Sequence, residues 1–133
     1  MQETLTLEVT TRLYGLGAER VAPPVFVVVP ARTVTARELI AAHVQAEVRQ
    51  AQQARVGSLA LHYLLDDDLR ARPEAAASAL DADTEAARAC DALAGRRYLL
   101  VVDGTTVTDL DAPVELSARS VVSFVRLLPL IGG

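Results

Sequence analysis

Apolar and polar residues alternate near the start of the chain. Leu5, Leu7 and Val9 are apolar, and the positions between them are polar or charged. Because successive side chains of a β-strand point to opposite faces, this period of two predicts a half-buried strand. Residues 13–24 contain two glycines and two prolines and predict the end of that strand, and the apolar run 25–29 predicts a second, more buried one.

An amphipathic helix is predicted after the second strand. Thr35 and Glu38 have the spacing of a capping box, in which each side chain satisfies an amide that is free at a helix start. The residues that follow form a stripe with spacings of three to five, predicted to pack on the sheet: Leu39, Ile40, His43, Val44, Val48 and Ala51. The polar residues predicted to face water are Arg37, Gln45, Glu47 and Arg49.

The region from about residue 52 to residue 97 is rich in alanine and charged residues, and we expect helices and loops there. Leucines at 59–65 suggest a short helix. A second helix is predicted over 81–94, capped by Asp83 or Thr84.

Strand patterns return after this region. Residues 98–102 predict a buried strand, and Asp103-Gly104 is a two-residue hairpin signal because both residues tolerate positive φ. Residues 105–109 should pair back, and residues 121–127 predict a last strand. The order of elements predicts an α+β fold in which one main helix, with an inserted helical region, covers a mixed sheet of four or five strands in a single domain, 1–133.

Composition narrows the function classes. The net charge is −4, with 17 acidic residues against 13 scattered basic ones, so we expect no nucleic-acid partner. No apolar run approaches the ~18–20 residues that span a bilayer, and the first residues lack a signal-peptide pattern, so we expect no membrane association. The single cysteine, Cys90, excludes an internal disulfide and favours a cytoplasmic location.

Candidate catalytic and metal-binding residues are few. His43 and His62 lie 19 residues apart without a motif of ligand spacing, and the acidic run 66–68 lacks the alternating ligands of a calcium loop, so no metal site is expected. Cys90 suits a small buried group on a helix. The sequence has no recognisable catalytic triad or phosphate-binding glycine loop, so we do not expect the chain to be an enzyme.

Gly132 and Gly133 follow the apolar end of the last predicted strand. Without Cβ atoms, an extended Gly-Gly can pass through a channel that is too narrow for side chains. It would present an ionised α-carboxylate, which can attack the α-phosphate of MgATP and form an acyl-adenylate.

The segment 98–133 resembles the C-terminal half of the β-grasp, ubiquitin-like proteins, especially the prokaryotic sulfur carriers of molybdopterin and thiamine biosynthesis. The matching residues are Val102-Asp103-Gly104, Thr105 to Leu110, and Phe124 to Gly133. The first two strands and the Thr35-capped helix match in order, so the resemblance covers about 90 of the 133 residues. The insertion at about 52–97 departs from the small sulfur carriers and is more similar to the larger bacterial ubiquitin-like modifiers.

The resemblance implies a modifier whose Gly133 is adenylated by an E1-like activating enzyme and joined to target amines by an isopeptide bond. ATP and Mg²⁺ would be used by that enzyme, and the chain itself would hold no cofactor. An E2-like conjugating enzyme, a deconjugating protease and target proteins are the implied partners. Gly132 would allow threading, and the expected docking tail comprises Arg126, Leu128, Pro129, Leu130 and Ile131.

Alternatives remain open at this point. One is a sulfur carrier with a C-terminal thiocarboxylate, and another is a non-covalent β-grasp adaptor that binds partners with its sheet. The apolar tail, 128–133, could also pack on its own molecule or drive formation of a homo-oligomer.

Overall fold

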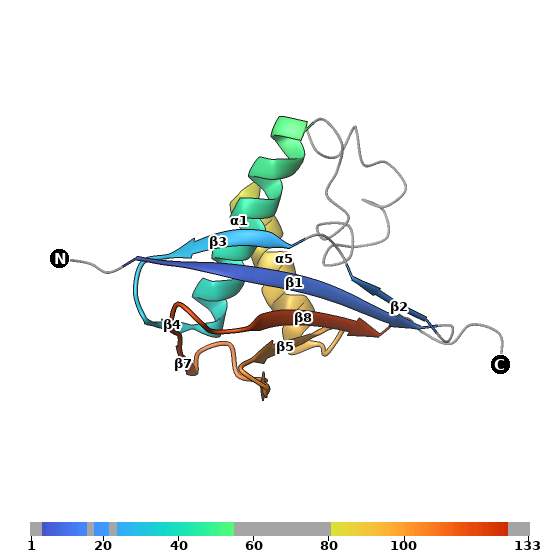
Figure 1. Cartoon of the computed structure of the whole chain (residues 1–133). Helices are drawn as coiled ribbons and strands as arrows, with labels where there is room; N and C mark the ends of the chain where they lie inside the picture. The colour runs from blue at the N-terminus through green and yellow to red at the C-terminus, as the bar shows by residue number, and fades with distance from the viewer. Residues whose placement is uncertain (1–3, 16–17, 22–23, 55–80, 128–133) are drawn as a thin grey trace.

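The first and last described strands lie side by side in the centre of a mixed β-sheet (Figure 1). The computed structural model describes residues 4–15, 18–21, 24–54 and 81–127. Its strands are β1 (Leu5–Gly15), β2 (Ala18–Val21), β3 (Val25–Val29), β4 (Thr33–Thr35), β5 (Leu99–Val102), β6 (Thr105–Val107), β7 (Pro113–Glu115) and β8 (Val122–Leu127). Its helices are α1 (Ala36–Ala54) and α5 (Ala82–Ala94).

The main sheet has six strands but is five strands wide, because β2 and β3 both pair with β1 on the same side. β8 runs parallel to β1 on one side. On the other side, β3 pairs antiparallel with residues 5–9 of β1, and β2 pairs antiparallel with residues 12–15. β5 pairs with the other side of β8, and β6 pairs with β5. The predicted α+β class and mixed sheet are therefore confirmed.

β1 is longer than the pattern predicted. The expectation that the strand breaks from residue 13 is wrong, because β1 continues to Gly15 and β2 folds back on it, with Gly15 opposite Ala18. β8 pairs with β1 as far as Tyr14, and β2 pairs with it as far as Gly15, so backbone groups are satisfied there despite the weak strand preference of glycine. Pro24 lies between β2 and β3, as expected for a strand breaker.

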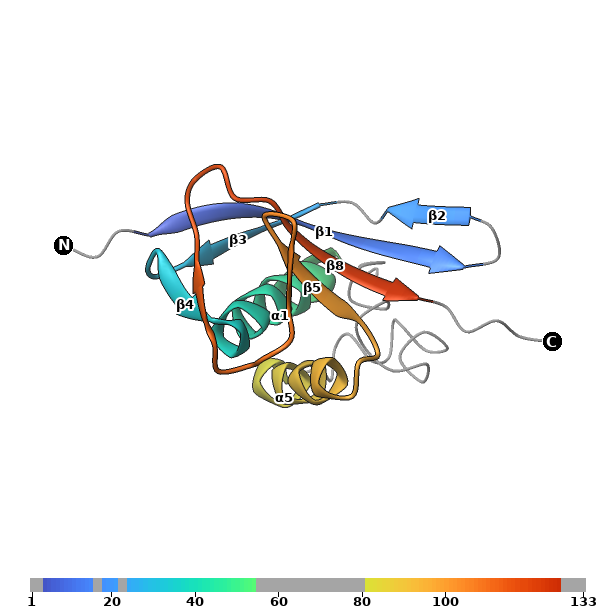
Figure 2. The same cartoon turned by 90° about the horizontal axis from the view of Figure 1, so that it is seen from below.

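Both helices cover the same face of the sheet, and the core lies between these two layers (Figure 2). In β3 the alternate residues Val25, Val27 and Val29 are buried, whereas Phe26 and Val28 are exposed on the other face. The predicted stripe of α1 is buried from Leu39 to Val48, which confirms the helix face that meets the sheet.

The capping box of α1 is present as predicted. The amide of Glu38 donates to the Thr35 hydroxyl at 3.1 Å, and the amide of Thr35 donates to the Glu38 carboxylate at 3.1 Å. The predicted cap of α5 is wrong, because Asp81 is the cap and accepts from the backbone amide of Thr84 at 3.1 Å. Thr84 lies three residues after the cap, and its hydroxyl also donates a hydrogen bond to the Asp81 carboxylate at 2.6 Å.

β4 and β7 form a small antiparallel ribbon that was not predicted from the sequence. Each strand has three residues, which is too short for a period of two to stand out. The helix predicted at 59–65 lies outside the described residues. Among the described residues, no helix has the length and apolar character needed to cross a membrane.

Candidate functional site

β8 leads directly to the predicted site, and it is held in the middle of the sheet. β1 pairs with it from Val122 to Leu127, and β5 pairs with it from Val122 to Val125. Arg126, the first residue of the predicted docking tail, lies in this strand opposite Leu13 and is half-buried. The rest of the predicted site, Leu128, Pro129, Leu130, Ile131, Gly132 and Gly133, lies outside the described residues.

Aromatic packing anchors β8 to the elements beneath it. Phe124 is fully buried, and its ring centroid lies 4.6 Å from that of His43 on α1 and 5.5 Å from that of Tyr98. The Tyr98 hydroxyl donates a hydrogen bond of 2.6 Å to the Ala89 carbonyl oxygen on α5. The strand before the tail is thereby tied to both helices.

A buried ionisable pair lies in this anchor. His43 Nε2 and Glu47 Oε1 are 2.6 Å apart, and both side chains are fully buried. The prediction that Glu47 faces water is therefore wrong. α5 packs beside α1, so α1 is covered by the sheet and by a second helix, and its buried surface is wider than one stripe. The spacing of four places Glu47 on the same side of α1 as His43, and this was the sequence signal for a contact between the two side chains.

Cys90 lies on α5 and is buried, as predicted from its place in an alanine-rich helix. Burial raises the pKa of its thiol, although the positive charge of Arg37 acts in the opposite direction. A thiol with a raised pKa is a poor nucleophile at neutral pH. Cys90 is therefore a packing residue in this arrangement.

The start of β8 is bound to the β5–β6 hairpin. Asp103 and Gly104 both have positive φ, 50° and 81°, as the predicted two-residue turn requires. The Asp103 carboxylate accepts from the Val121 amide at 2.7 Å and from the Ser120 hydroxyl at 3.0 Å. The Asp103 amide also donates to the Val121 carbonyl oxygen at 2.9 Å. The hairpin thus fixes where β8 begins.

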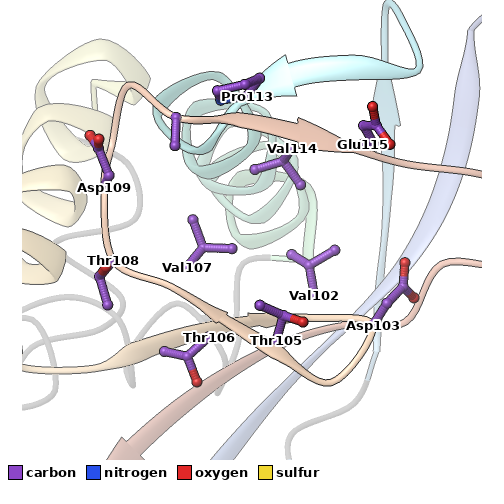
Figure 3. A pocket seen from close by; sticks show the side chains of 11 residues that line it. Val102, Asp103, Thr105, Thr106, Val107, Thr108, Asp109, Pro113, Val114 and Glu115 are labelled. Atoms are coloured by element: carbon purple, nitrogen blue, oxygen red, sulfur yellow. The ribbon is translucent and has the colours of Figure 1, made fainter.

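A pocket of about 390 Å³ lies between this hairpin and β7 (Figure 3). Val102, Val107 and Val114 point toward its centre. Its charged lining residues are Asp103, Asp109 and Glu115, and its eleven lining residues include no histidine, cysteine, lysine or arginine. The pocket can therefore hold an aliphatic group and accept hydrogen bonds, but its lining supplies no thiol or imidazole for catalysis.

The described residues include no group of three or more histidine, cysteine, aspartate or glutamate side chains placed to hold a metal ion. His62 and the acidic run 66–68 lie outside the described residues. Comparisons of the chain with protein-family models, with curated proteins and with solved structures found no match.

Proposed function

We propose that this chain is a β-grasp, ubiquitin-like protein modifier whose Gly133 carboxylate is activated by an E1-like enzyme and joined to amines of target proteins. One observation carries the proposal. The parallel pair of β1 and β8 lies at the sheet centre, with β3 outside β1, with β5 and β6 outside β8, and with α1 over one face. This arrangement is compatible with the β-grasp fold and adds to the resemblance of residues 98–133.

The position of β8 supports the role assigned to the residues after it. Hydrogen bonds to β1 and β5 and the packing of Phe124 hold the strand from both edges and from below. A modifier needs a rigid body from which its reacting end extends, because an activating enzyme recognises the body while it binds the end. The end of β8 would provide that junction.

The chemistry requires only a carboxylate from this chain. An oxygen of the Gly133 carboxylate attacks the α-phosphorus of ATP, the bond to pyrophosphate breaks, and an acyl-adenylate forms. A thiol of the activating enzyme then displaces AMP, and transfer to an E2-like thiol and finally to a target amine forms the amide and releases the thiol. The chain is the substrate in each step, and ATP and Mg²⁺ belong to the activating enzyme.

Mass spectrometry of conjugates from the native host tests the proposal. An N-terminally tagged chain is expressed, captured under denaturing conditions and digested with trypsin. Because trypsin cleaves after Arg126, a modified lysine should carry the remnant Leu-Leu-Pro-Leu-Ile-Gly-Gly. The matched controls are a chain lacking Gly132 and Gly133, which should give no remnant, and Thr106→Ala on the exposed surface of β6, which should give the same remnants as the parent chain.

The same spectra separate the alternatives. A sulfur carrier would show one carboxylate oxygen of Gly133 replaced by sulfur and no remnant on lysine. An adaptor would show an unmodified C-terminus and no remnant. Either of these two results, or a mature chain that does not end at Gly133, would overturn the proposal of conjugation through this residue.

A further inference from the structure

β3 is an edge strand that is apolar on both faces. Among the described residues it pairs only with β1, so its other edge has no strand partner there. On the face opposite the helices, Phe26 is 66% exposed and Val28 is 61% exposed. Val121, immediately before β8, is the other large apolar side chain with comparable exposure, at 63%, in the described part of the chain.

An edge of this kind is a template for a further strand, because its outward amides and carbonyls are ready to pair. Proteins commonly protect such edges with charged side chains, but residues 25–29 read Val-Phe-Val-Val-Val and contain no charge. Pro24 and Pro30 lie immediately outside the strand. Because proline has no amide hydrogen to donate, these two residues confine any pairing to the five residues between them.

We propose that β3 pairs antiparallel with β3 of a second copy of this chain, in a register centred on Val27. In a two-fold pairing the same strand supplies both sides of the interface, so the strand must be complementary to itself. β3 satisfies this condition, because Val27 would lie opposite Val27 of the second copy, and Phe26 would lie opposite Val28 of the second copy.

The side chains brought together by this pairing would differ between the two faces of the sheet. On the exposed face, the two Phe26–Val28 pairs place an aromatic ring beside a β-branched side chain, which is a favourable cross-strand combination. On the other face, Val25 and Val29 would oppose each other at the margin of the two cores. A strand without charge offers nothing to select a charged peptide, whereas a second β3 matches it in length, in polarity and in the limits set by the prolines.

The pairing should be weak. An interface confined to two five-residue strands is smaller than the ~1,200 Å² at which stable, specific interfaces begin. We therefore expect a dimer that forms with rising concentration. This inference does not depend on the proposed function, because it concerns the edge of the sheet and not the residues that follow β8.

Sedimentation equilibrium across a concentration series tests the proposal. The parent chain should pass from a mass of 14.2 kDa toward twice that value. Phe26→Lys should raise the dissociation constant about tenfold or more, a change of ~1.4 kcal/mol, because each lysine would replace an aromatic–Val28 pair and two like charges would share one small interface. Val121→Lys is the matched control, since Val121 has similar exposure away from β3, and it should leave association unchanged.

Circular dichroism of each variant confirms that the fold is retained, as expected for substitutions of exposed side chains. A parent chain that stays monomeric at all concentrations would overturn the proposal. So would association that survives in Phe26→Lys, which would show that another surface forms the dimer.

Cysteine pairing tests the register. Phe26→Cys and Val28→Cys proteins are prepared separately, and the native Cys90 remains in place because it is buried. A mixture of the two should form a disulfide-linked dimer under mild oxidation at least several times faster than either protein alone, because residue 26 lies opposite residue 28 of the second copy. Equal rates in the mixture and in the separate proteins would contradict the register.

Discussion

His43 and Glu47 are ionisable residues whose side chains are both fully buried. Their side chains approach to 2.6 Å, but the contact is not aligned as a hydrogen bond, and both have polar atoms without a hydrogen-bond partner. Breaking a buried pair by removing one partner typically costs ~3–5 kcal/mol, whereas replacing both partners with apolar groups is often neutral or stabilising. We therefore expect the pair to add little net stability, although each partner depends on the other.

Glu47→Leu should thus lower the free energy of unfolding by about 3 kcal/mol, because it leaves the imidazole of His43 buried without its partner. The double variant His43→Leu/Glu47→Leu should recover at least half of that loss. Urea denaturation of the two single variants and the double variant gives the coupling energy, and Gln45→Leu on the exposed side of α1 is the control. Additive losses in the double variant would show that the two side chains do not act as a pair.

Tyr98 is a second buried polar residue, and its environment makes its ionisation unfavourable. Burial is the main cause that raises the pKa of this phenol far above its ordinary value, and the charges of Cys90 and Glu47 raise it further. The neutral phenol is also the form that donates to the Ala89 carbonyl oxygen. Below pH ~10 the phenol is neutral in both the folded and the unfolded chain, and the stabilisation linked to its raised pKa is fully present. This stabilisation is lost as the pH rises above ~10, because only the unfolded chain can ionise Tyr98 there.

Alkaline titration of the parent chain and of Tyr98→Phe should therefore differ by a phenolate signal that appears only as the protein unfolds. Absorbance reports the phenolate, and circular dichroism reports unfolding in the same samples. If the signal of Tyr98 appears near pH 10 while the circular dichroism is still that of the folded protein, the proposed environment of this residue is incorrect.

Among the elements, the β5–β6 hairpin depends most directly on one residue. Gly104 has φ of +81°, a conformation that costs a residue with a side chain ~1–2 kcal/mol. Gly104→Ala should lower the free energy of unfolding by about that amount. Gly95→Ala is the matched control, because Gly95 has φ of −82° and its added Cβ would meet no atom closer than 3.5 Å. Equal losses in the two variants, measured by urea denaturation, would show that the turn conformation is not the cause.

The elements with strong local signals could be predicted from the sequence. The capping box at Thr35, the apolar stripe of α1 and the Asp103-Gly104 turn each depend on residues that are close together in the chain. The burial of Glu47 could not be predicted from α1 alone, because it depends on elements that pack against α1 from distant parts of the sequence. β7 was missed because it has three residues and its partner, β4, lies far away in the sequence. β2 was missed because residues 13–24, with two glycines and two prolines, were interpreted as the end of a strand, although β2 folds back on the adjacent β1.

The candidate site was predicted from the type and position of residues, not from the fold. Gly132 and Gly133 were selected because glycine without Cβ suits a narrow channel. The pocket beside Asp103 was not predicted, because its walls come from the β5–β6 hairpin, from β7 and from the residues between them, which surround a space only after folding.

At the scale of the whole molecule, the central position of β8 separates two surfaces. The strand is enclosed by β1 and β5, whereas β3 lies at the far edge of the sheet. Pairing of two copies through β3 would therefore leave the end of β8 uncovered by the partner strand. The proposed conjugation and the proposed association therefore do not use the same strand.

The whole chain also limits how it could be joined to itself. All 13 basic residues are arginine, so the 133 residues offer no lysine to which a second copy could be linked. If the proposed conjugation occurs, a target with a single lysine and a blocked N-terminus should gain one copy of the chain, seen as one shifted band in gel electrophoresis. A ladder that disappears when the N-terminal amine is blocked would indicate head-to-tail chains through that amine. A ladder that persists after the block would contradict amide linkage through Gly133, because no other amine in the chain could accept it.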